Sequence, residues 1–388
     1  MAQRQLASPR QLLSRLTGNG SILIIALWSL CFLSTYIVIL GCQLRQKIVL
    51  LRRLDQRDRL NLIADAAVKK AIIELKKQEL KPYDSLSDGL SNEPAVFKDV
   101  HINSGKFSIA YDFTDEQSGS RVTRYGLIDE ESKININKAG LVVLERIFKI
   151  LLDSDELRAQ ELAACIVDWR DSDSELSIPL GSAEDSYYRG LRYSYEAKDA
   201  DFQALEELLL VKGMDEELLE KLKPYITIYG NGMVNVNTAS RVVLAALGIN
   251  EAMVSNILSF RSGEDELAGS ADDNIFTSPG DILPKLKAAY QLSEAQEAKL
   301  NAVIEQSLAV NSSHFMVQGV AQLNSQSHKP AGSGLPSDKP EGNGGQPNSR
   351  SHKPEGNGAA SDSRSHKPGQ KTVCVINREG KLLSWRQL

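Results

Sequence analysis

The longest apolar run in the chain is SILIIALWSLCFLSTYIVILG, at residues 21–41, and it contains no charged residue. At 1.5 Å per residue, a helix of this length spans about 30 Å, the thickness of the hydrocarbon core of a bilayer. The run therefore predicts one transmembrane helix at residues 21–41.

Residues 42–80 are polar on most faces but keep one apolar stripe. Leu44, Ile48, Leu51 and Leu54 recur at spacings of three and four, and the segment contains no Pro or Gly after Gly41. This spacing is typical of one face of a helix. We expect a single helix from Ser21 to about Leu80. The alternative is a coiled-coil stalk, which would require a sustained heptad, and the pattern loosens after Leu54.

Residues 81–131 and the C-terminus have the alternating pattern of strands. The runs 106–113 (KFSIAYDF) and 120–128 (SRVTRYGLI) flank the turn-rich TDEQSG and predict a hairpin. Residues 313–323 and 372–388 predict further strands, with a turn at Arg378-Glu379-Gly380. The expected fold class is α+β, with a long helix on a small antiparallel sheet.

Residues 132–312 are rich in Leu, Ala and Glu at helical spacing, and they predict an inserted all-α domain. This segment repeats itself. ININKAGLVVLERI (134–147) matches VNVNTASRVVLAAL (234–247) at an offset of 100, and DADFQALEELL (199–209) resembles DNIFTSPGDIL (273–283), which pairs Phe202 with Phe276. Two matches in the same order indicate two copies of one unit, of the helix-hairpin-helix or SAM-like kind, with about 26 extra residues in the first copy.

The NxNxA motif of both copies predicts a structural role, in which an Asn caps the following helix. Helix-hairpin-helix modules that bind DNA open similarly, so a membrane-tethered DNA-binding or uptake protein is an alternative function. Such modules need a Gly-rich turn with basic flanks. The second copy has only Leu247-Gly248-Ile249-Asn250 followed by Glu251, and the first is acidic there. The net charge of −5 also argues against a nucleic-acid partner.

Three further features complete the sequence analysis: a low-complexity segment, the cysteines and the absence of catalytic motifs. Residues 324–371 repeat SHKP and EGNG, lack aromatic residues and predict a disordered low-complexity loop. Cys165 and Cys374 lie far apart in the sequence and each is flanked by apolar residues, which favours buried free thiols over a disulfide. The chain has no GxSxG, HExxH, P-loop or dinucleotide motif, so we do not expect an enzyme.

The order of segments at the N-terminus resembles a type IV prepilin leader. A short basic segment, residues 1–20, ends at Gly20, directly before the apolar run that starts at Ser21. Cleavage there would leave the anchor on the mature chain, unlike a secretory signal peptide. The fifth mature position, where major pilins carry Glu, is Ile25. A count of flanking Lys and Arg favours a cytoplasmic C-terminal side, whereas the leader indicates a cytoplasmic N-terminus.

The motifs DEESKININKA, VDWRDSDSE, GSAEDSYY, FQALEELLLVKGMDEELLEKLKPYITIYG and VNVNTAS, in this order, resemble the K class of minor pseudopilins of type II secretion (the GspK family). The resemblance covers most of residues 15–320. It implies a pseudopilin-like fold and a non-enzymatic subunit at the tip of the periplasmic pseudopilus. It also implies I-class and J-class minor pseudopilins as partners, processing by the prepilin peptidase, and a single-pass location in the bacterial inner membrane with a periplasmic C-terminal domain.

The extra residues of the first repeat copy contain the candidate metal site. Asp171, Asp173, Glu184 and Asp185 lie around a turn at Pro179 and Gly181. Carboxylates on such a loop suit Ca²⁺, although the spacing is not that of an EF-hand. The resemblance implies calcium in the same region. We therefore predict a Ca²⁺ site at these four residues, with a solvated acidic loop as the alternative.

Overall fold

The computed structural model describes residues 17–78, 81–103, 105–116, 119–153, 155–179, 181–324 and 369–388. It divides into two units, one up to Arg59 and one from Leu60 to Leu388. Helix α2 (Thr17–Lys77) starts in the first unit and ends in the second. The prediction of one long helix is thus confirmed, and it ends at Lys77 rather than near Leu80.

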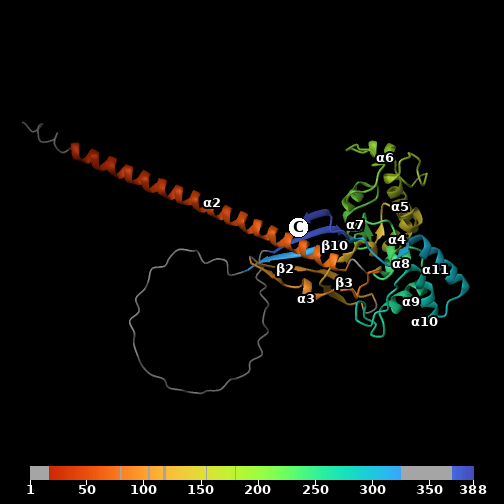
Figure 1. Cartoon of the computed structure of the whole chain (residues 1–388). Helices are drawn as coiled ribbons and strands as arrows, with labels where there is room; N and C mark the ends of the chain where they lie inside the picture. The colour runs from red at the N-terminus through yellow and green to blue at the C-terminus, as the bar shows by residue number, and fades with distance from the viewer. Residues whose placement is uncertain are drawn as a thin grey trace, which may run out of the picture. The chain divides into compact units, whose positions relative to one another are not determined.

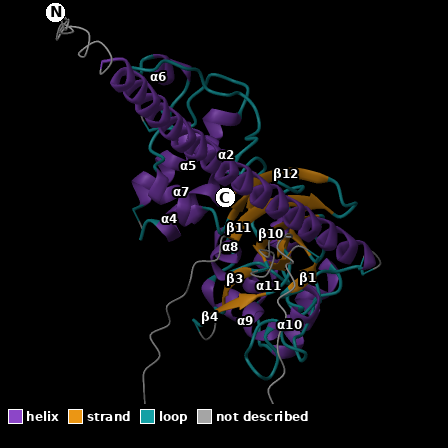
Figure 2. Cartoon of the chain, turned by 90° about the vertical axis from the view of Figure 1, so that its left-hand side faces the viewer, coloured by secondary structure: helices purple, strands orange, loops and turns teal. Residues whose placement is uncertain are grey.

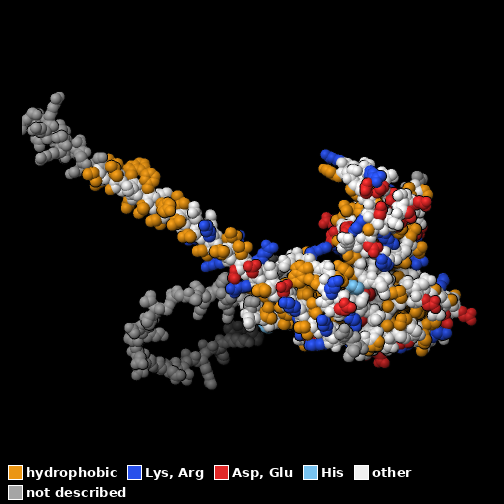
Figure 3. Space-filling model, turned by 45° about the horizontal axis from the view of Figure 1, so that its top comes forward, with side chains coloured by type: hydrophobic (Ala, Val, Ile, Leu, Met, Phe, Trp, Pro, Cys, Tyr) orange, Lys and Arg blue, Asp and Glu red, His pale blue; other side chains and the backbone are white. Residues whose placement is uncertain are grey.

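The first unit contains the apolar run, whose side chains are exposed from Ile22 onward. Figure 3 shows hydrophobic side chains covering this part of α2. Among the residues described, α2 is the one helix long and apolar enough to cross a membrane, with a mean hydropathy of 2.5 in its most apolar window. A helix that is apolar all round requires an apolar environment, so the unit fits a membrane anchor.

The second unit is built on a six-stranded antiparallel sheet, drawn in Figures 1 and 2. The strand order is β1-β2-β10-β11-β12, and β5 also pairs with β10. The strands are β1 (Val100–Ile102), β2 (Gly105–Ile109), β5 (Ile128–Asp129), β10 (His314–Leu323), β11 (Gly369–Asn377) and β12 (Leu382–Gln387).

The C-terminal part of α2 packs on one face of this sheet. Alternate residues of β10 are buried, and they share one apolar core with buried residues of α2, including Ile63 and Leu75. A Cβ at Gly319 would lie only 3.3 Å from Cβ of Ala67. The absence of a side chain at Gly319 therefore lets helix and strand approach closely.

The predicted hairpin of residues 106–113 and 120–128 is wrong in its extent. The first run divides at Ala110, whose N–H donates to the carbonyl of Gln318 (3.0 Å). The part before it is β2 in the main sheet, and the part after it, β3 (Tyr111–Thr114), pairs with β4 (Arg121–Arg124) in a separate two-stranded sheet. Apolar alternation continues through the division because both halves bury side chains, so the pattern alone could not locate it.

The C-terminal strands agree with the prediction, except that β11 begins at Gly369, within the segment assigned to the loop of residues 324–371. Residues 325–368 of that loop, and residues 1–16 of the predicted leader, lie outside the described residues.

Residues 132–312 are mainly helical, but four very short strands accompany the helices, so the prediction of an all-α domain is wrong in this respect. β6 pairs with β7 and β8 with β9, both in parallel. Besides α2, the described helices of the second unit are α3 (Pro94–Phe97), which precedes this segment, and η1 (Glu130–Ser132), α4 (Leu141–Leu151), α5 (Glu156–Arg170), α6 (Asp185–Arg189), η2 (Leu205–Leu210), α7 (Glu216–Leu222), α8 (Arg241–Ala246), α9 (Glu251–Arg261), η3 (Pro279–Asp281), α10 (Ile282–Ala289) and α11 (Glu294–Ser307). The short strands are β6 (Ile134–Asn135), β7 (Ile226–Thr227), β8 (Val234–Asn235) and β9 (Leu308–Ala309).

A buried polar cluster joins the sheet to the helical segment. Asp129 of β5 accepts hydrogen bonds from Asn235 Nδ2 (3.0 Å), Thr238 Oγ1 (2.5 Å) and Ser312 Oγ (2.7 Å). Beside it, Arg378 of the β11–β12 turn binds both carboxylate oxygens of Asp84. Segments that are distant in the sequence are thus connected by charged and polar side chains as well as by apolar packing.

Candidate metal centre

The two NxNxA copies make the same contacts and position the segment that carries the acidic loop. Asn137 accepts a hydrogen bond from the N–H of Phe202 (2.7 Å) and donates to its carbonyl (3.0 Å). Asn237 makes the same pair of bonds with Phe276, both at 2.9 Å. The prediction that an Asn caps the following helix is wrong, since the N-caps of α4 and α8 are Gly140 and Ser240.

An arginine completes each copy. Arg170, the last residue of α5, donates to the carbonyls of Ile136 and Ala139. Arg261, the last residue of α9, donates to those of Val236 (3.1 Å) and Ala239 (2.7 Å). The two copies therefore make equivalent contacts, as expected of a repeat. Their helix-hairpin-helix or SAM-like class stays a prediction. The end of α5 is fixed by Arg170, and the acidic loop starts at the next residue.

Two buried carboxyl groups, those of Asp168 and Glu184, and the half-buried Asp171 lie where the acidic loop leaves α5 and returns to α6. Asp168 is fully buried and accepts hydrogen bonds from the N–H of Ser177 (3.0 and 3.3 Å). Glu184, directly before α6, is also buried. Oδ1 of Asp171 and Oε1 of Glu184 are buried without a hydrogen-bond partner among the described residues.

The electrostatics of this group disfavour the charged carboxylates. Burial, followed by the charges of Asp168 and Asp171, raises the pKa of Glu184 to about 7. Burial and the charges of Asp173, Asp168 and Asp199 raise the pKa of Asp171. Like charges in a desolvated site favour a bound proton or a bound cation.

The structure brings together only part of the predicted ligand set. Asp171 and Glu184 lie in one electrostatic group, and Asp173 contributes charge to it while Oδ1 of Asp173 accepts from the N–H of Glu175 (2.8 Å). Asp185 is engaged elsewhere, because it accepts from the N–H of Ala197 (2.9 Å) and pairs with Arg189 (2.8 Å).

Sequence reasoning gave too little weight to two residues of the group. Neither Asp168 nor Asp199 belongs to the ligand set predicted from the sequence. The position of Asp168 in the last turn of α5, before an acidic loop, was the available signal. Asp199 is 26 residues after Asp173 and was not recognisable without the fold.

No three His, Cys, Asp or Glu side chains are close enough together to hold a metal ion, as far as residues 17–324 and 369–388 are described. Nevertheless, the unpaired oxygens of Asp171 and Glu184 suit a hard cation that prefers carboxylate ligands. The residues present are therefore compatible with Ca²⁺, provided that their side chains rotate toward a common point.

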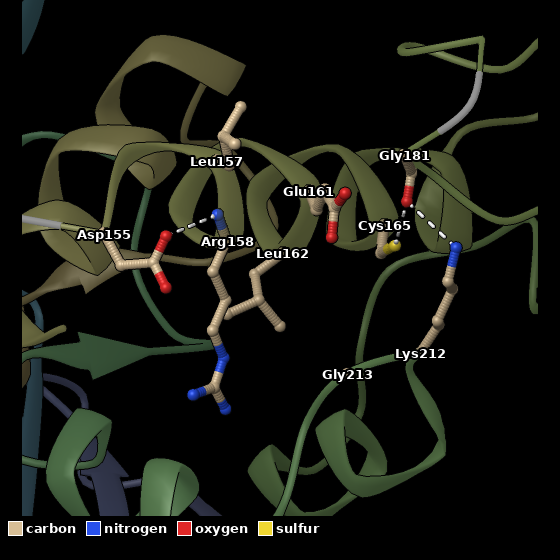
Figure 4. A pocket seen from close by; sticks show the side chains of 9 residues that line it. All are labelled: Asp155, Leu157, Arg158, Glu161, Leu162, Cys165, Gly181, Lys212 and Gly213. Carbon is tan, nitrogen blue, oxygen red and sulfur yellow. Dashed lines mark hydrogen bonds between the residues drawn. The ribbon is translucent and has the colours of Figure 1, made fainter.

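A cavity of about 410 Å³ lies beside α5 and is drawn in Figure 4. Cys165 and Lys212 both point toward the carbonyl of Gly181, to which Lys212 Nζ donates (3.0 Å). Burial raises the pKa of the Cys165 thiol to about 12. The thiol is therefore protonated at neutral pH and is not an activated nucleophile. Cys165 and Cys374 are free thiols.

In the turn that could have served DNA binding, Leu247-Gly248-Ile249-Asn250, two backbone amides are occupied. The N–H groups of Leu247 and Gly248 donate to the carbonyls of Val243 (3.1 Å) and Ala245 (2.9 Å). A phosphate-binding turn presents free amides, so these two groups give no support to the alternative function.

Comparison with known proteins gives one consistent result. Residues 127–231 match the family model described as type II secretion system (T2SS), protein K. A type II secretion system protein K of Aeromonas hydrophila is 27% identical over 162 residues, 39% of this chain and 49% of that protein. One of Klebsiella pneumoniae is 37% identical over 101 residues, 25% of this chain and 30% of that protein. The chain thus matches half or less of the length of these relatives.

The fold is similar to that of a solved structure, described as the GspK-GspI-GspJ complex from the type 2 secretion system of enterotoxigenic Escherichia coli. The TM-score is 0.57 at 16% identity, over 87% of this chain and 98% of the other. The resemblance to the K class is therefore confirmed: residues 127–231 match the family model of type II secretion system protein K, and the fold is similar to that of a chain in the GspK-GspI-GspJ complex.

Proposed function

We propose that this chain is a minor pseudopilin at the tip of a type II secretion pseudopilus, where it initiates assembly and aids the export of folded periplasmic proteins across the outer membrane. The match of residues 127–231 to the protein K family carries the proposal. The exposed apolar helix supports it, because such a helix can be held first in lipid and then among similar helices. The role is structural rather than enzymatic.

The proposed partners are I-class and J-class minor pseudopilins, since the similar fold comes from a GspK-GspI-GspJ complex. The test is co-purification of the full chain with both partners from cells that express all three. We expect a stable ternary complex. A chain that purifies alone, while the two partners bind each other, would contradict the proposal.

Processing is proposed to occur between Gly20 and Ser21, both of which lie in α2. The prepilin peptidase would remove residues 1–20 and leave residues 21–41 as a single-pass anchor in the inner membrane, with the C-terminal domain in the periplasm. Mass analysis of the chain from cells with and without this peptidase tests the proposal. We expect a start at Ser21 with an added methyl group only when the peptidase is present. A chain that retains Met1 in both cells would rule out the leader.

Calcium is proposed to bind the acidic loop through Asp171 and Glu184, with Asp168 and Asp173 nearby and Asp185 as a further candidate. The unpaired buried oxygens and the raised pKa of Glu184 support this choice. We expect a chelator to lower the Tm of the full chain in detergent, and Ca²⁺ to restore it by mass action. The double variant Asp171→Asn/Glu184→Gln should not respond to either. An unchanged Tm of the original chain in chelator would contradict the proposal.

A further inference from the structure

The segment of α2 that follows the apolar run is strongly basic. Six cations occur between residues 45 and 59, against two carboxylates, Asp55 and Asp58, which leaves a net charge of +4. We call residues 45–59 the basic segment. Its cations are Arg45, Lys47, Arg52, Arg53, Arg57 and Arg59.

Five of these six cations are free for an external ligand. Residues 45–55 are exposed, as are Arg57 and Asp58. Arg59 pairs with Asp55 (3.0 Å), and within the described part of the chain the other five cations have no acidic partner. Figure 3 shows Lys and Arg side chains appearing on α2 where its apolar covering ends. These cations have no role in the main sheet or in the acidic loop.

The arginines share one side of the helix. At 100° per residue, all five lie within an arc of roughly 160°, with Arg45, Arg52 and Arg59 almost in line at spacings of seven. Lys47 lies on the opposite side, among apolar positions. The charge therefore forms a continuous strip along the helix rather than a ring around it.

The near end of the strip is within reach of a bilayer surface. Measured along the helix from Gly41, Arg45 and Lys47 lie about 6 and 9 Å beyond the apolar run, and Arg53 about 18 Å. Helical side chains lean toward the N-terminus, which here is toward the membrane. The headgroup layer extends about 5–8 Å past the hydrocarbon, and attraction persists over a Debye length of about 8–10 Å. Tilting of the helix toward its arginine side would bring the outer arginines closer to the bilayer surface.

The residue types indicate the ligand. Five of the six cations are arginines, whose planar guanidinium can bind two oxygens of one phosphate. We propose that the basic segment binds anionic phospholipid headgroups at the bilayer surface from which the apolar run emerges. This gives a role to cations that are unusual on the translocated side of an anchor. The proposal rests on the membrane anchor of the proposed function.

The experiment measures lipid selectivity of the full chain in vesicles of phosphatidylcholine and phosphatidylglycerol, with spin-labelled lipids of both kinds. An attraction of about 1 kcal/mol for each cation near an anionic surface corresponds to roughly a fivefold preference for phosphatidylglycerol over phosphatidylcholine. We expect the immobilised lipid to be enriched severalfold in phosphatidylglycerol, and the enrichment to fall when salt is raised from 0.05 to about 0.5 M.

The test variant removes four cations near the bilayer, and the control removes four exposed lysines elsewhere. The test variant is Arg45→Gln, Lys47→Gln, Arg52→Gln and Arg53→Gln. The control variant is Lys69→Gln, Lys76→Gln, Lys98→Gln and Lys299→Gln, all at exposed positions. We expect the test variant to lose the enrichment and the control variant to keep it.

Three outcomes would overturn the inference. One is a chain that inserts but shows no enrichment, and another is equal loss in both variants; both leave the proposed function intact. The third is a test variant that keeps its enrichment but no longer co-purifies with I-class and J-class pseudopilins, which would assign the strip to a protein partner. A chain that alkaline carbonate extracts from membranes would instead refute the anchor itself.

Discussion

At the scale of single residues, Glu184 illustrates how folding changes the chemistry of a carboxyl group. Burial and the charges of Asp168 and Asp171 raise its pKa from 4.5 to about 7. The folded chain therefore binds more protons than the unfolded chain between these two pH values. By linkage, this group favours folding at low pH, and its contribution to stability decreases as the pH rises from 4.5 to 7.

We predict that Glu184→Gln raises the Tm of the full chain at pH 8 in chelator, because the amide has the shape of the protonated acid and carries no charge. The gain should become small near pH 4.5, where Glu184 is protonated in the folded state and half protonated in the unfolded state. Thermal unfolding between pH 4.5 and 8 measures the difference. Glu175→Gln, at an exposed position of the same loop, is the control and should change little. A gain that does not depend on pH would contradict this account.

The same group shows what sequence could predict about a site. The acidic composition drew attention to the loop in which oxygens of Asp171 and Glu184 are buried without a partner, while calcium binding there stays a prediction. The sequence could not separate the other predicted ligands, Asp173 and Asp185, because the fold decides which carboxylate oxygens accept hydrogen bonds from backbone N–H groups. Asp185 is occupied by the N–H of Ala197, which is 12 residues away, and no local pattern predicts that bond.

At the scale of elements, the contact of α2 with β10 depends on small side chains. Cβ of Ala67 would be 3.3 Å from a Cβ at Gly319, so the two backbones approach more closely than larger residues permit. Period-four spacing in the helix and alternation in the strand predicted both elements. They did not predict that these two residues meet.

We predict that Gly319→Leu lowers the free energy of unfolding by about 1–3 kcal/mol, because the new side chain must displace α2 or leave its preferred rotamer. Gly319→Ala should cost much less, and Val320→Leu, on the other face of β10, serves as the control. Urea unfolding of the full chain in detergent measures all three. Equal stability of Gly319→Leu and the original chain would show that the contact is not close.

The repeated asparagines allow a matched test within one chain. Asn137 and Asn237 each satisfy the N–H and the carbonyl of one buried Phe. We predict that replacing either by Ala lowers the free energy of unfolding by about 1–3 kcal/mol, since two buried polar groups lose a partner. Asn237 is the more buried and should cost more. Urea titration measures both, with Asn301→Ala on the surface of α11 as control. A negligible cost at both positions would contradict the shared role.

At the scale of the whole second unit, charged side chains hold distant segments together. Arg378 of the β11–β12 turn binds Asp84 and also donates to the carbonyl of Ser312 (2.9 Å). Burial raises the pKa of Asp84, while the charge of Arg378 opposes that rise. Removal of Arg378 would leave a buried carboxylate without its partner.

We predict that Arg378→Met lowers the free energy of unfolding by about 3 kcal/mol, the order expected when one partner of a buried pair is removed. The double variant Asp84→Asn/Arg378→Met should lose less, because no charge is left unpaired. Arg386→Met is the control, since its pair with Glu206 is exposed and should contribute at most about 1 kcal/mol. A double-mutant cycle in urea checks the coupling. Strictly additive losses would contradict it.

The sequence by itself determined the elements whose signal is local: the apolar helix of residues 21–41 and its continuation, the C-terminal strands, the two repeat copies and the acidic loop. Hydrophobic period and turn residues fix such features over a few positions. The tertiary structure alone decided the division of residues 106–113 between two sheets, the parallel pairs of two-residue strands, and the partners of Asn137 and Asp185. These features depend on contacts between residues far apart in the chain, and an isolated segment carries no information about its distant partner.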